Sequence, residues 1–385
     1  MPSSTGYTLT DYGSMILDNI RMPAYAEALR RHVKPGMVVA DLGAGTGVFS
    51  LLACKLGAAR VYAIEPDSSI LVARESAAAN GYADRMFCIQ GLSIDTKLPE
   101  RVDLLVSDLR GSLPLLDFHV PAIRDARERL LKPDGCLIPQ RDVMRCAPIK
   151  APKDYARLEQ PWDRNDYDLD LGAARKYVAR SWWQAIFAAD QLLAEPMPWA
   201  TMDYASIVDA NVDGSMDWTI ERAGILHGLA VWFDAELCEG IGYSNAPGLP
   251  DTVYGQRFIP LTAPVTVVAG DRLHARLRAN LVHGDYVFRW DTSVTGADGL
   301  VKASFSQTSL GAAPMSTEDL AKRVDTYTPT LNEKGRIECF VLEAMTRGQS
   351  LRDISQAVTD RFPQRFANWR SALDVVAELS AKYSD

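Results

Sequence analysis

The chain has 385 residues, with 41 basic and 49 acidic side chains and a formal net charge of −8. This length exceeds the size at which single hydrophobic cores usually stop growing, so we expect two or three domains, and an apolar content of 47% excludes a disordered chain. The acidic balance argues against nucleic acid or an anionic membrane surface as the main partner.

The N-terminal ten residues lack the charged and apolar regions of a signal peptide, and no apolar run approaches the roughly 20 residues needed to span a bilayer. We therefore expect a cytoplasmic protein that does not bind a membrane. The cysteines show neither a C-x-x-C pair nor a histidine at ligand spacing, so we expect no metal site and no disulfide framework. They are Cys54, Cys88, Cys136, Cys146, Cys238 and Cys339.

Residues 33–139 alternate short β-branched runs with longer helical patterns, which is typical of a parallel sheet covered on both faces. Strands are predicted at Val38–Ala40, Arg60–Ile64, Met86–Ile89, Leu104–Val106 and Cys136–Ile138. Helices are predicted at Val48–Leu56, Ser68–Asn80 and Val120–Leu131. We therefore expect an α/β, Rossmann-like domain over about residues 1–145.

After Pro139 the pattern changes to strand-like runs separated by Gly, Pro and Asp, which predicts a mostly antiparallel, barrel-like β domain over residues 146–315. The clearest runs are Gly228–Phe233, Val265–Ala269 and Tyr286–Trp290. An aromatic-rich stretch at Leu171–Leu193 is predicted to form a helical insert. A polar linker at Ala312–Ser316 then leads to a largely helical segment, residues 325–385.

A glycine-rich loop, Asp41-Leu-Gly43-Ala-Gly45-Thr-Gly47, follows the first predicted strand and opens a helix. Backbone in such a loop can approach a ligand closely, with its amides pointing outward. A dinucleotide fingerprint needs a third glycine three positions after the second, and that position is Val48. The G-x-G-x-G spacing instead suits the amino-acid end of S-adenosylmethionine.

Glu65 ends the second predicted strand, where a carboxylate can accept hydrogen bonds from both ribose hydroxyls of a nucleoside. The end of the third strand, with Gly91 and Leu92, would then lie beside the adenine ring. The simpler alternative is a glycine turn with an incidental surface glutamate. The glycine-rich loop and Glu65 agree with each other, and together they favour a donor site for S-adenosylmethionine.

With these residues in place, the chain resembles the protein arginine methyltransferase family over about residues 11–310. After the fourth strand, Asp108 and Asp117 stand nine positions apart, where the family has two glutamates that hold the substrate guanidinium. The resemblance implies S-adenosylmethionine as cofactor and a side-chain nitrogen as acceptor. It also implies a homodimer, with the insert at about 168–200 as dimerisation arm.

The same resemblance assigns further residues. Residues 15–21 match the family's N-terminal helix, which implies that Arg21 contacts the donor's carboxylate and that Met15 packs near the sulfonium. Val253 and Tyr254 replace the histidine and tryptophan of the family's Thr-His-Trp loop. His119 stands where the family usually places a methionine beside the acceptor.

The acceptor chemistry leaves alternatives open. Asp108 and Asp117 can orient an N–H acceptor by charge-assisted hydrogen bonds, and His119, titrating near neutral pH, could take the proton. Arg110 lies between the two acids and could pair with either. A guanidinium has a pKa above about 12 and must lose its proton during transfer, so an imidazole, amine or hydroxyl would suit His119 better. Turn or capping roles are the simpler alternatives.

The C-terminal segment resembles a PqqD-type module, a small winged-helix fold that captures leader peptides in ribosomal peptide pathways. The resemblance rests on an opening strand pair from Thr328, a helix at Glu338–Met345, a second helix from Ser350 and a last helix through Trp369. With eight basic and nine acidic side chains over residues 325–385, it lacks the basic face of a DNA-binding winged helix.

The sequence thus predicts a dimeric methyltransferase that modifies a side-chain nitrogen of a peptide or protein, with a built-in peptide-recognition module. A methyltransferase for a small molecule or hydroxyl acceptor is one alternative. A catalytically silent donor-binding scaffold is another, because the acceptor motifs depart from the family's pattern.

Overall fold

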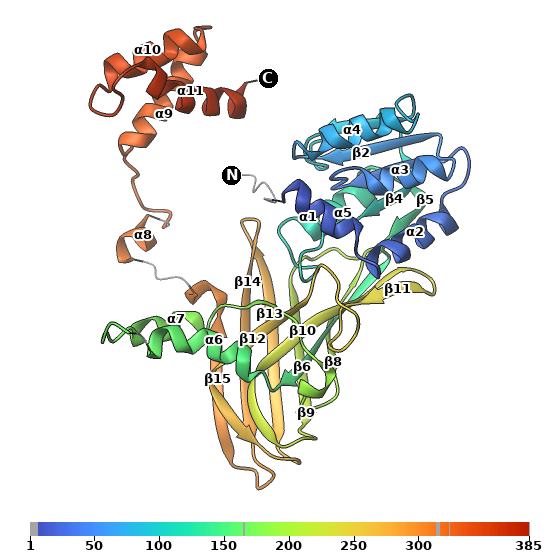
Figure 1. The fold of residues 1–385 in the computed structure, drawn as a ribbon, viewed down its shortest axis with the longest axis vertical. Helices are drawn as coiled ribbons and strands as arrows, with labels where there is room; N and C mark the ends of the chain where they lie inside the picture. The colour runs from blue at the N-terminus through green and yellow to red at the C-terminus, as the bar shows by residue number, and fades with distance from the viewer. Residues whose placement is uncertain (1–6, 165, 313–315, 323, 385) are drawn as a thin grey trace. The chain divides into compact units, whose positions relative to one another are not determined.

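The computed structural model describes residues 7–164, 166–312, 316–322 and 324–384. The chain divides into two compact units, Met1–Pro314 and Met315–Asp385 (Figure 1). The predicted linker at Ala312–Ser316 coincides with this division, although its residues 313–315 lie outside the described part.

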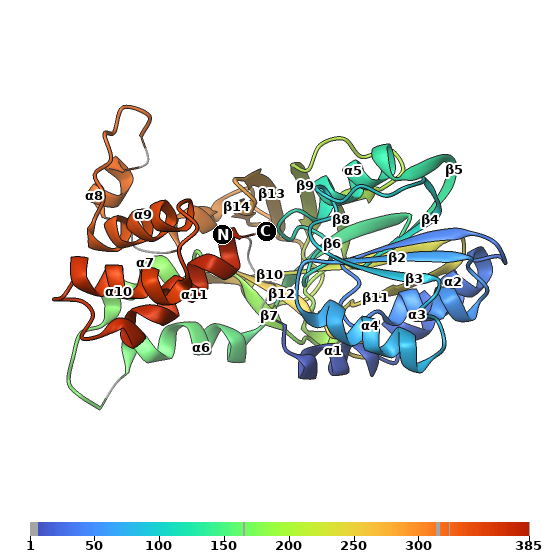
Figure 2. The same ribbon diagram turned by 90° about the horizontal axis from the view of Figure 1, so that it is seen from above.

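The first unit begins with a five-stranded parallel sheet in the order β3-β2-β1-β4-β5. All five predicted strands are confirmed, as β1 Val38–Leu42, β2 Arg60–Glu65, β3 Met86–Gln90, β4 Val102–Ser107 and β5 Leu131–Ile138. Around the sheet lie the helices α2 Arg21–His32, α3 Val48–Lys55, α4 Ser69–Ala79 and α5 His119–Arg129. Figure 2 shows α5 on one face of the sheet and α3 and α4 on the other. Both faces are therefore covered, which is why the strands read as nearly continuous apolar runs.

Two antiparallel sheets follow, in the orders β7-β12-β10-β6-β8, with β11 paired to β10, and β15-β14-β13-β9. Their strands are β6 Arg141–Ile149, β7 Trp183–Ala185, β8 Met197–Asp203, β9 Val212–Thr219, β10 Gly224–Cys238, β11 Ile241–Ser244, β12 Gln256–Val267, β13 Arg272–Val282, β14 Asp285–Thr295 and β15 Val301–Thr308. The predicted antiparallel β region is confirmed. Because β6 belongs to this region, the boundary lies between Ile138 and Arg141, slightly before the predicted residue 145.

The aromatic insert is not the continuous helix that was predicted over Leu171–Leu193. Its main helix, α6 Pro152–Asp163, comes earlier, and only the short α7 Arg175–Val178 and two single 3-10 turns lie inside the predicted range. Trp183 instead begins β7, where it pairs in register with Phe258 of β12. The rings of Trp183 and Phe187 pack against Phe258 at centroid distances of 5.2 and 5.8 Å. These sheet contacts override the helical pattern, as aromatic residues favour a strand in such a setting.

The second unit is helical, with α8 Thr317–Ala321, α9 Glu333–Met345, α10 Leu351–Arg361 and α11 Trp369–Tyr383. The three longer helices share an apolar core and begin at side-chain caps on Asn332, Ser350 and Asn368. The predicted opening strand pair is wrong: residues 328–331 form no strand, and Asn332 starts α9 instead. The predicted second and last helices are confirmed, whereas the winged-helix form lacks its strands in the described part of this unit.

None of the described helices combines the length and apolar character needed to cross a bilayer. Within the described residues, no cluster of three His, Cys, Asp or Glu side chains is arranged to hold a metal ion. The six cysteines are free thiols rather than disulfide partners.

Candidate functional site

The glycine loop after β1 needs its glycines for conformational reasons. Gly43, Gly45 and Gly47 have φ angles of +67°, +53° and +82°, in the left-handed region that side chains disfavour. Space is short as well, because a Cβ on Gly45 would lie 2.5 Å from the ring of Tyr12. The loop therefore keeps bare backbone at the end of β1, where α3 begins at Val48. This is the local geometry that the sequence predicted for a donor-binding turn.

Two buried acids flank this loop. The Oδ2 atom of Asp41 accepts hydrogen bonds from the backbone N and Oγ of Ser50 at 3.0 and 2.7 Å, whereas Oδ1 has no partner in the described part of the chain. Burial raises the pKa of Asp41 to about 7. Such an unpartnered, buried carboxylate oxygen can receive a cationic ligand group, which would favour its ionised form.

Glu65 lies at the end of β2, turned toward the glycine loop. Its Oε2 and Oε1 atoms accept hydrogen bonds from the backbone N–H groups of Gly45 and Asp67, both at 2.9 Å. Burial raises the pKa of Glu65. Each oxygen keeps a lone pair for a further donor such as a hydroxyl. Gly91 lies next to this acid, because its N–H donates to the Glu65 carbonyl at 3.1 Å, and Leu92 beside it is exposed.

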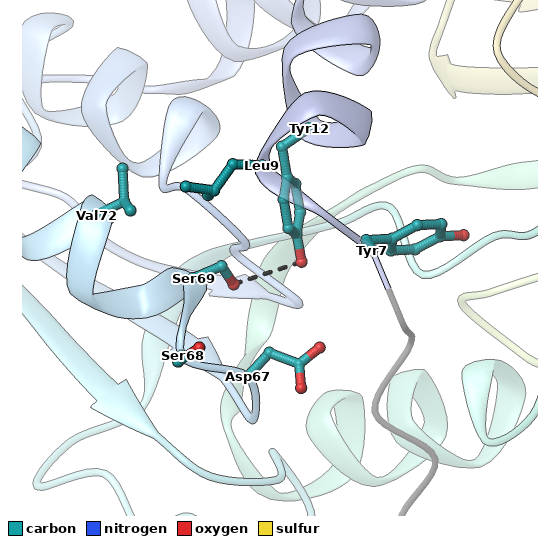
Figure 3. Close-up of a pocket in the computed structure, with 7 residues that line it drawn as sticks. All are labelled: Tyr7, Leu9, Tyr12, Asp67, Ser68, Ser69 and Val72. Atoms are coloured by element: carbon teal, nitrogen blue, oxygen red, sulfur yellow. Dashed lines mark hydrogen bonds between the residues drawn. The ribbon is translucent and has the colours of Figure 1, made fainter.

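A pocket opens at the residues that follow β2, between the N-terminal helix α1 Leu9–Ile16 and the start of α4. Figure 3 shows Tyr7, Leu9 and Tyr12 on one side and Asp67, Ser68, Ser69 and Val72 on the other. The Ser69 hydroxyl donates to the Tyr12 hydroxyl at 3.4 Å across the pocket. The N-terminal helix therefore lies over the glycine loop, and it carries the half-buried Met15.

Arg21, the first residue of α2, forms a buried cluster with Asp108 and Tyr254. Its Nε donates to Asp108 Oδ2 and to the Tyr254 hydroxyl, and one terminal nitrogen donates to the Met15 carbonyl at 3.1 Å. The Tyr254 hydroxyl lies 2.8 and 2.7 Å from the two Asp108 carboxylate oxygens. Although burial opposes ionisation, the guanidinium groups of Arg21 and Arg110 hold the pKa of Asp108 below its ordinary value. Arg21, predicted to contact the donor, and Asp108, predicted to bind the acceptor, are thus in direct contact.

Arg110 is fully buried and pairs mainly with Asp142 of β6. Its Nε and one terminal nitrogen donate to the two Asp142 oxygens, both at 2.7 Å, and the other terminal nitrogen donates to the Tyr25 hydroxyl at 2.6 Å. It also reaches Asp108 at 3.2 Å. Of the two acids that it was expected to choose between, it pairs with Asp108 and not with Asp117. The Arg110 charge is neutralised mainly by Asp142. Arg110 therefore does not neutralise Asp117.

Asp117 stands just before α5 and is half-buried, with a left-handed φ of +41°. Partial burial and the nearby Asp285 of β14 raise its pKa. Burial and the charges of Asp108, Asp11 and Asp117 raise the pKa of the Tyr7 hydroxyl, so both acids act electrostatically on that hydroxyl.

His119 does not fit the predicted role of a base that titrates near neutral pH. It is 2% exposed, and burial together with the Arg110 guanidinium lowers its pKa to about 3. The Tyr204 hydroxyl donates to Asp142 at 2.5 Å, so the 2.8 Å bond between His119 Nε2 and Tyr204 is one in which the histidine donates. His119 is thus a neutral member of the Arg110–Asp142 network, and its buried position explains why sequence reasoning misplaced it.

The low pKa of His119 predicts a measurable effect on stability. Below pH 6.5 this histidine is protonated in the unfolded chain, whereas it stays neutral in the folded protein until the pH approaches 3. The contribution of His119 to the free energy of unfolding is therefore complete above pH 6.5 and falls as the pH drops toward 3, by at most about 1.4 kcal/mol per pH unit. His119→Gln, which keeps a donor for Tyr204, should show a shallower loss of stability in urea unfolding between pH 7 and pH 4. The exposed His274→Gln is the control. Equal slopes for wild type and His119→Gln would contradict the buried, neutral assignment.

Sequence reasoning missed three residues that hold the site together. Tyr254 was noted as a substitution but not as a site residue. Asp142 and Asp18 are buried acids, and Asp18 accepts hydrogen bonds from the backbone N–H of Arg21 at 2.8 Å and of Val253 at 2.9 Å. The available signal for Asp142 was an aspartate at the start of the β6 strand, directly before Val143 and Met144. Asp18 fixes Arg21 against the loop that carries Tyr254.

Comparison with known proteins agrees with this architecture. Residues 25–138 match the family model of ribosomal protein L11 methyltransferase (PrmA). The arginine N(omega)-methyltransferase of Streptomyces achromogenes subsp. streptozoticus is 30% identical over 274 residues, which cover 69% of this chain and 74% of that protein. Human protein arginine N-methyltransferase 2 is 29% identical over 281 residues, which cover 69% of this chain and 65% of that protein. The match spans only 53% of a probable protein arginine N-methyltransferase 6 from Arabidopsis thaliana.

Solved structures are similar over more than three quarters of this chain. The crystal structure of Arabidopsis thaliana protein arginine methyltransferase 10 superposes with a TM-score of 0.69 at 25% identity, covering 78% of this chain and 97% of that one. The Trypanosoma brucei PRMT1 enzyme-prozyme heterotetramer with AdoHcy gives the same TM-score at 23% identity, which shows the fold.

The parallel sheet, its glycine loop and the acid at the end of β2 define the fold class of S-adenosylmethionine-dependent methyltransferases. The antiparallel β region and the similarity to arginine methyltransferases identify one family within this class. The chain belongs to the protein arginine N-methyltransferase family.

Proposed function

We propose that this protein transfers a methyl group from S-adenosylmethionine to a guanidinium nitrogen of arginine, in a peptide or protein substrate. The observation that carries the proposal is the buried cluster of Asp108 with Arg21 and Tyr254, in a chain whose glycine loop keeps bare backbone at the end of β1. The relatives' names, which specify arginine N-methyltransferases, support arginine as the acceptor.

The residues around the glycine loop fit the donor. Asp41 Oδ1 is the unpartnered buried acceptor that the donor's ammonium group requires, and Glu65 keeps lone pairs for ribose hydroxyls. Arg21 is assigned to the donor carboxylate and Met15 to the neighbourhood of the sulfonium. Gly91 and Leu92 are assigned to the adenine ring. S-adenosylmethionine, when bound, supplies an electrophilic methyl group at its sulfonium.

Asp108 and Asp117 are assigned different parts of acceptor binding. Asp108 already accepts hydrogen bonds from Arg21, Arg110 and Tyr254, so it has little capacity left for a guanidinium while Arg21 stays on it. If Arg21 binds the donor carboxylate, it releases a lone pair of Asp108 for the acceptor. Asp117, with a raised pKa, is the acid suited to accept the proton that leaves during transfer.

A hydroxyl acceptor, the main alternative raised by the sequence, would need a base. The buried and neutral His119 does not supply one, because its Nε2 is bonded to Tyr204, its Nδ1 is shielded from solvent and its pKa is about 3. The two carboxylates suit a cationic nitrogen acceptor better, since they attract and orient it by charge-assisted hydrogen bonds.

Asp117→Asn should lower kcat by at least about 100-fold toward an arginine peptide, because the variant can no longer take up the proton. Its affinity for S-adenosylmethionine should stay within a factor of about two, since Asp117 lies on the acceptor side. Fixed-time assays with labelled S-adenosylmethionine measure kcat, and calorimetric titration of the donor measures its affinity. Asp125→Asn, on the helix α5 that follows Asp117 and paired with Arg129, is the matched control. Full turnover in Asp117→Asn would refute the assignment.

We further propose a homodimer that uses the segment at about 168–200 as its arm, and a cytoplasmic location. Support for an oligomer comes from the family, in which a trypanosome relative forms an enzyme-prozyme heterotetramer. The segment also exposes apolar side chains at Leu169, Leu171 and Ile186, which a partner's surface could cover.

The C-terminal unit is proposed to recruit peptide substrates, in the manner of a PqqD-like module of ribosomal peptide maturation. Its capture would use helices, because the strand edge needed for strand addition is missing from the described residues. This unit is compact by itself, with its own apolar core, so its removal should spare donor binding.

A chain ending at Pro314 should keep its donor affinity but show a KM at least tenfold higher for a leader-containing precursor peptide, while short core peptides react as before. Initial rates for both peptides on both chains provide the comparison. Unchanged kinetics with the precursor peptide would show that the C-terminal unit serves another purpose.

A further inference from the structure

Arg257 of β12 is a half-buried arginine without a counter-ion. Its Nε is completely shielded from solvent and has no hydrogen-bond partner among the described residues, and no described carboxylate forms an ion pair with its guanidinium. The Nε of Arg278 is shielded in the same way, but a terminal nitrogen of Arg278 pairs with Asp291. Within the described part of the chain, Arg257 therefore lacks the partner that a buried charge ordinarily has.

Arg257 is charged at neutral pH and can be reached by a ligand. Burial lowers its pKa to about 10, which is still well above neutrality, and only the Tyr7 hydroxyl acts in the opposite direction. Of its three side-chain nitrogens only Nε is completely shielded, and the two terminal nitrogens form no hydrogen bond with the described residues. A partly desolvated cation with accessible N–H groups favours the binding of an anion, because the anion replaces the lost hydration.

Aromatic packing holds the guanidinium of Arg257 in place. Its central carbon lies 4.6 Å from the centroid of the Trp182 ring, and the centroid of that ring lies 4.4 Å from the centroid of the Phe288 ring on β14. Strand β7, which begins directly after Trp182, pairs with β12 so that Gln184 is the register partner of Arg257. The Gln184 amide also donates to the Tyr254 carbonyl at 2.8 Å. Trp182 is therefore anchored against Arg257 by the sheet, and the stacked guanidinium is ordered before any ligand arrives.

A stacked guanidinium presents its N–H groups along an edge, and a planar carboxylate is the anion that matches such an edge with two parallel hydrogen bonds. We propose that Arg257, with Trp182 stacked on its guanidinium, forms a binding site for a carboxylate group. The carboxylate can come from an aspartate or glutamate side chain of a peptide substrate, or from a small free carboxylate. This site goes beyond the proposed function and does not depend on which nitrogen receives the methyl group.

The side-chain Nε–H resonance of Arg257 in a nitrogen-labelled full chain tests the carboxylate site directly, and its absence from the spectrum of Arg257→Lys assigns it. Sodium acetate should shift this resonance saturably, whereas acetamide, the neutral isostere, and sodium chloride at the same concentration should not. The resonance of Arg276, an exposed arginine already paired with Asp213, is the matched control and should stay unchanged. An Arg257 resonance that does not respond to acetate, or responds equally to acetamide or chloride, would overturn the proposal.

A set of peptides distinguishes the two sources of the carboxylate. Labelled arginine peptides carry glutamate at each position in turn, and fluorescence anisotropy compares each with its glutamine twin on the full chain saturated with S-adenosylhomocysteine. If a peptide side chain supplies the carboxylate, glutamate at one position should tighten binding about 10-fold, and Arg257→Gln should remove that preference. Arg257→Lys, which keeps the charge but loses the planar fork, should retain part of it, and Arg276→Gln should retain all of it.

The remaining outcomes separate this inference from the proposed function, because neither binding measurement depends on methyl transfer. An acetate response without a glutamate preference at any position would support the site and assign it to a small free carboxylate. A glutamate preference that persists undiminished in Arg257→Gln would overturn the role of this residue. Methylated arginine in the products, with neither an acetate response nor a glutamate preference, would keep the proposed function and overturn the carboxylate site.

Discussion

Replacing Gly45 by Asp is expected to weaken S-adenosylmethionine binding by at least 100-fold. Gly45 has a left-handed φ, its Cβ position collides with Tyr12, and a new carboxylate there would repel Glu65, which accepts a hydrogen bond from the Gly45 backbone. Glu65→Ala should lower the affinity at least tenfold by removing the ribose acceptor. Calorimetric titration of the donor into each purified variant gives both values.

A matched control separates ligand binding from backbone strain. Gly299 has a φ of +85° with open space around its Cβ position, and it lies in the turn before β15. Gly299→Asp should therefore introduce similar strain and leave donor affinity unchanged. Donor affinity that is unchanged in Gly45→Asp and Glu65→Ala, with both proteins folded, would contradict the donor site.

Asp142→Asn is expected to destabilise the protein by about 3–5 kcal/mol, the usual effect of removing one partner from a buried ion pair. The side chains of Arg110 and Asp142 are completely buried, and the carboxylate also accepts from Tyr204. The variant leaves the buried Arg110 charge with Asp108 alone as counter-ion, and Asp108 is already paired with Arg21. Urea unfolding at pH 7 provides the measurement.

The exposed pair of Arg276 and Asp213 supplies the comparison, because Asp213→Asn should cost about 1 kcal/mol or less. A similar, small loss in Asp142→Asn would contradict the view that this pair holds the two parts of the first unit together. Its loss should also disturb Asp108, which shares Arg110.

Much of the fold could be predicted from the sequence where the pattern was local. The five parallel strands are short apolar runs buried on both faces, and the glycine loop allows few conformations other than the turn observed. In the C-terminal unit, Ser350 predicted the start of α10 because its side chain caps that helix. The failures were tertiary: Trp183 joins a strand because Phe258 lies opposite it, which no local pattern records.

The site was predictable only in part, for a related reason. The spacing of Asp108 and Asp117 predicted an acceptor region, yet the hydrogen-bond partners Arg21 and Tyr254 of Asp108 lie 87 and 146 positions away in the chain. The low pKa of His119 depends on burial and on Arg110, neither of which follows from its neighbours in the chain. Charges and hydrogen bonds between distant segments decide these roles, so they required the structure.

Transfer of labelled methyl groups to arginine is the central claim, and product analysis tests it most directly. The full chain is incubated with labelled S-adenosylmethionine and either L-arginine, an arginine-containing peptide or the same peptide with lysine in place of arginine, and the products are fragmented in a mass spectrometer. The account predicts methyl groups on guanidinium nitrogens of at least one arginine acceptor and none on the lysine peptide. Label on lysine, on a hydroxyl or on no acceptor at all would contradict it.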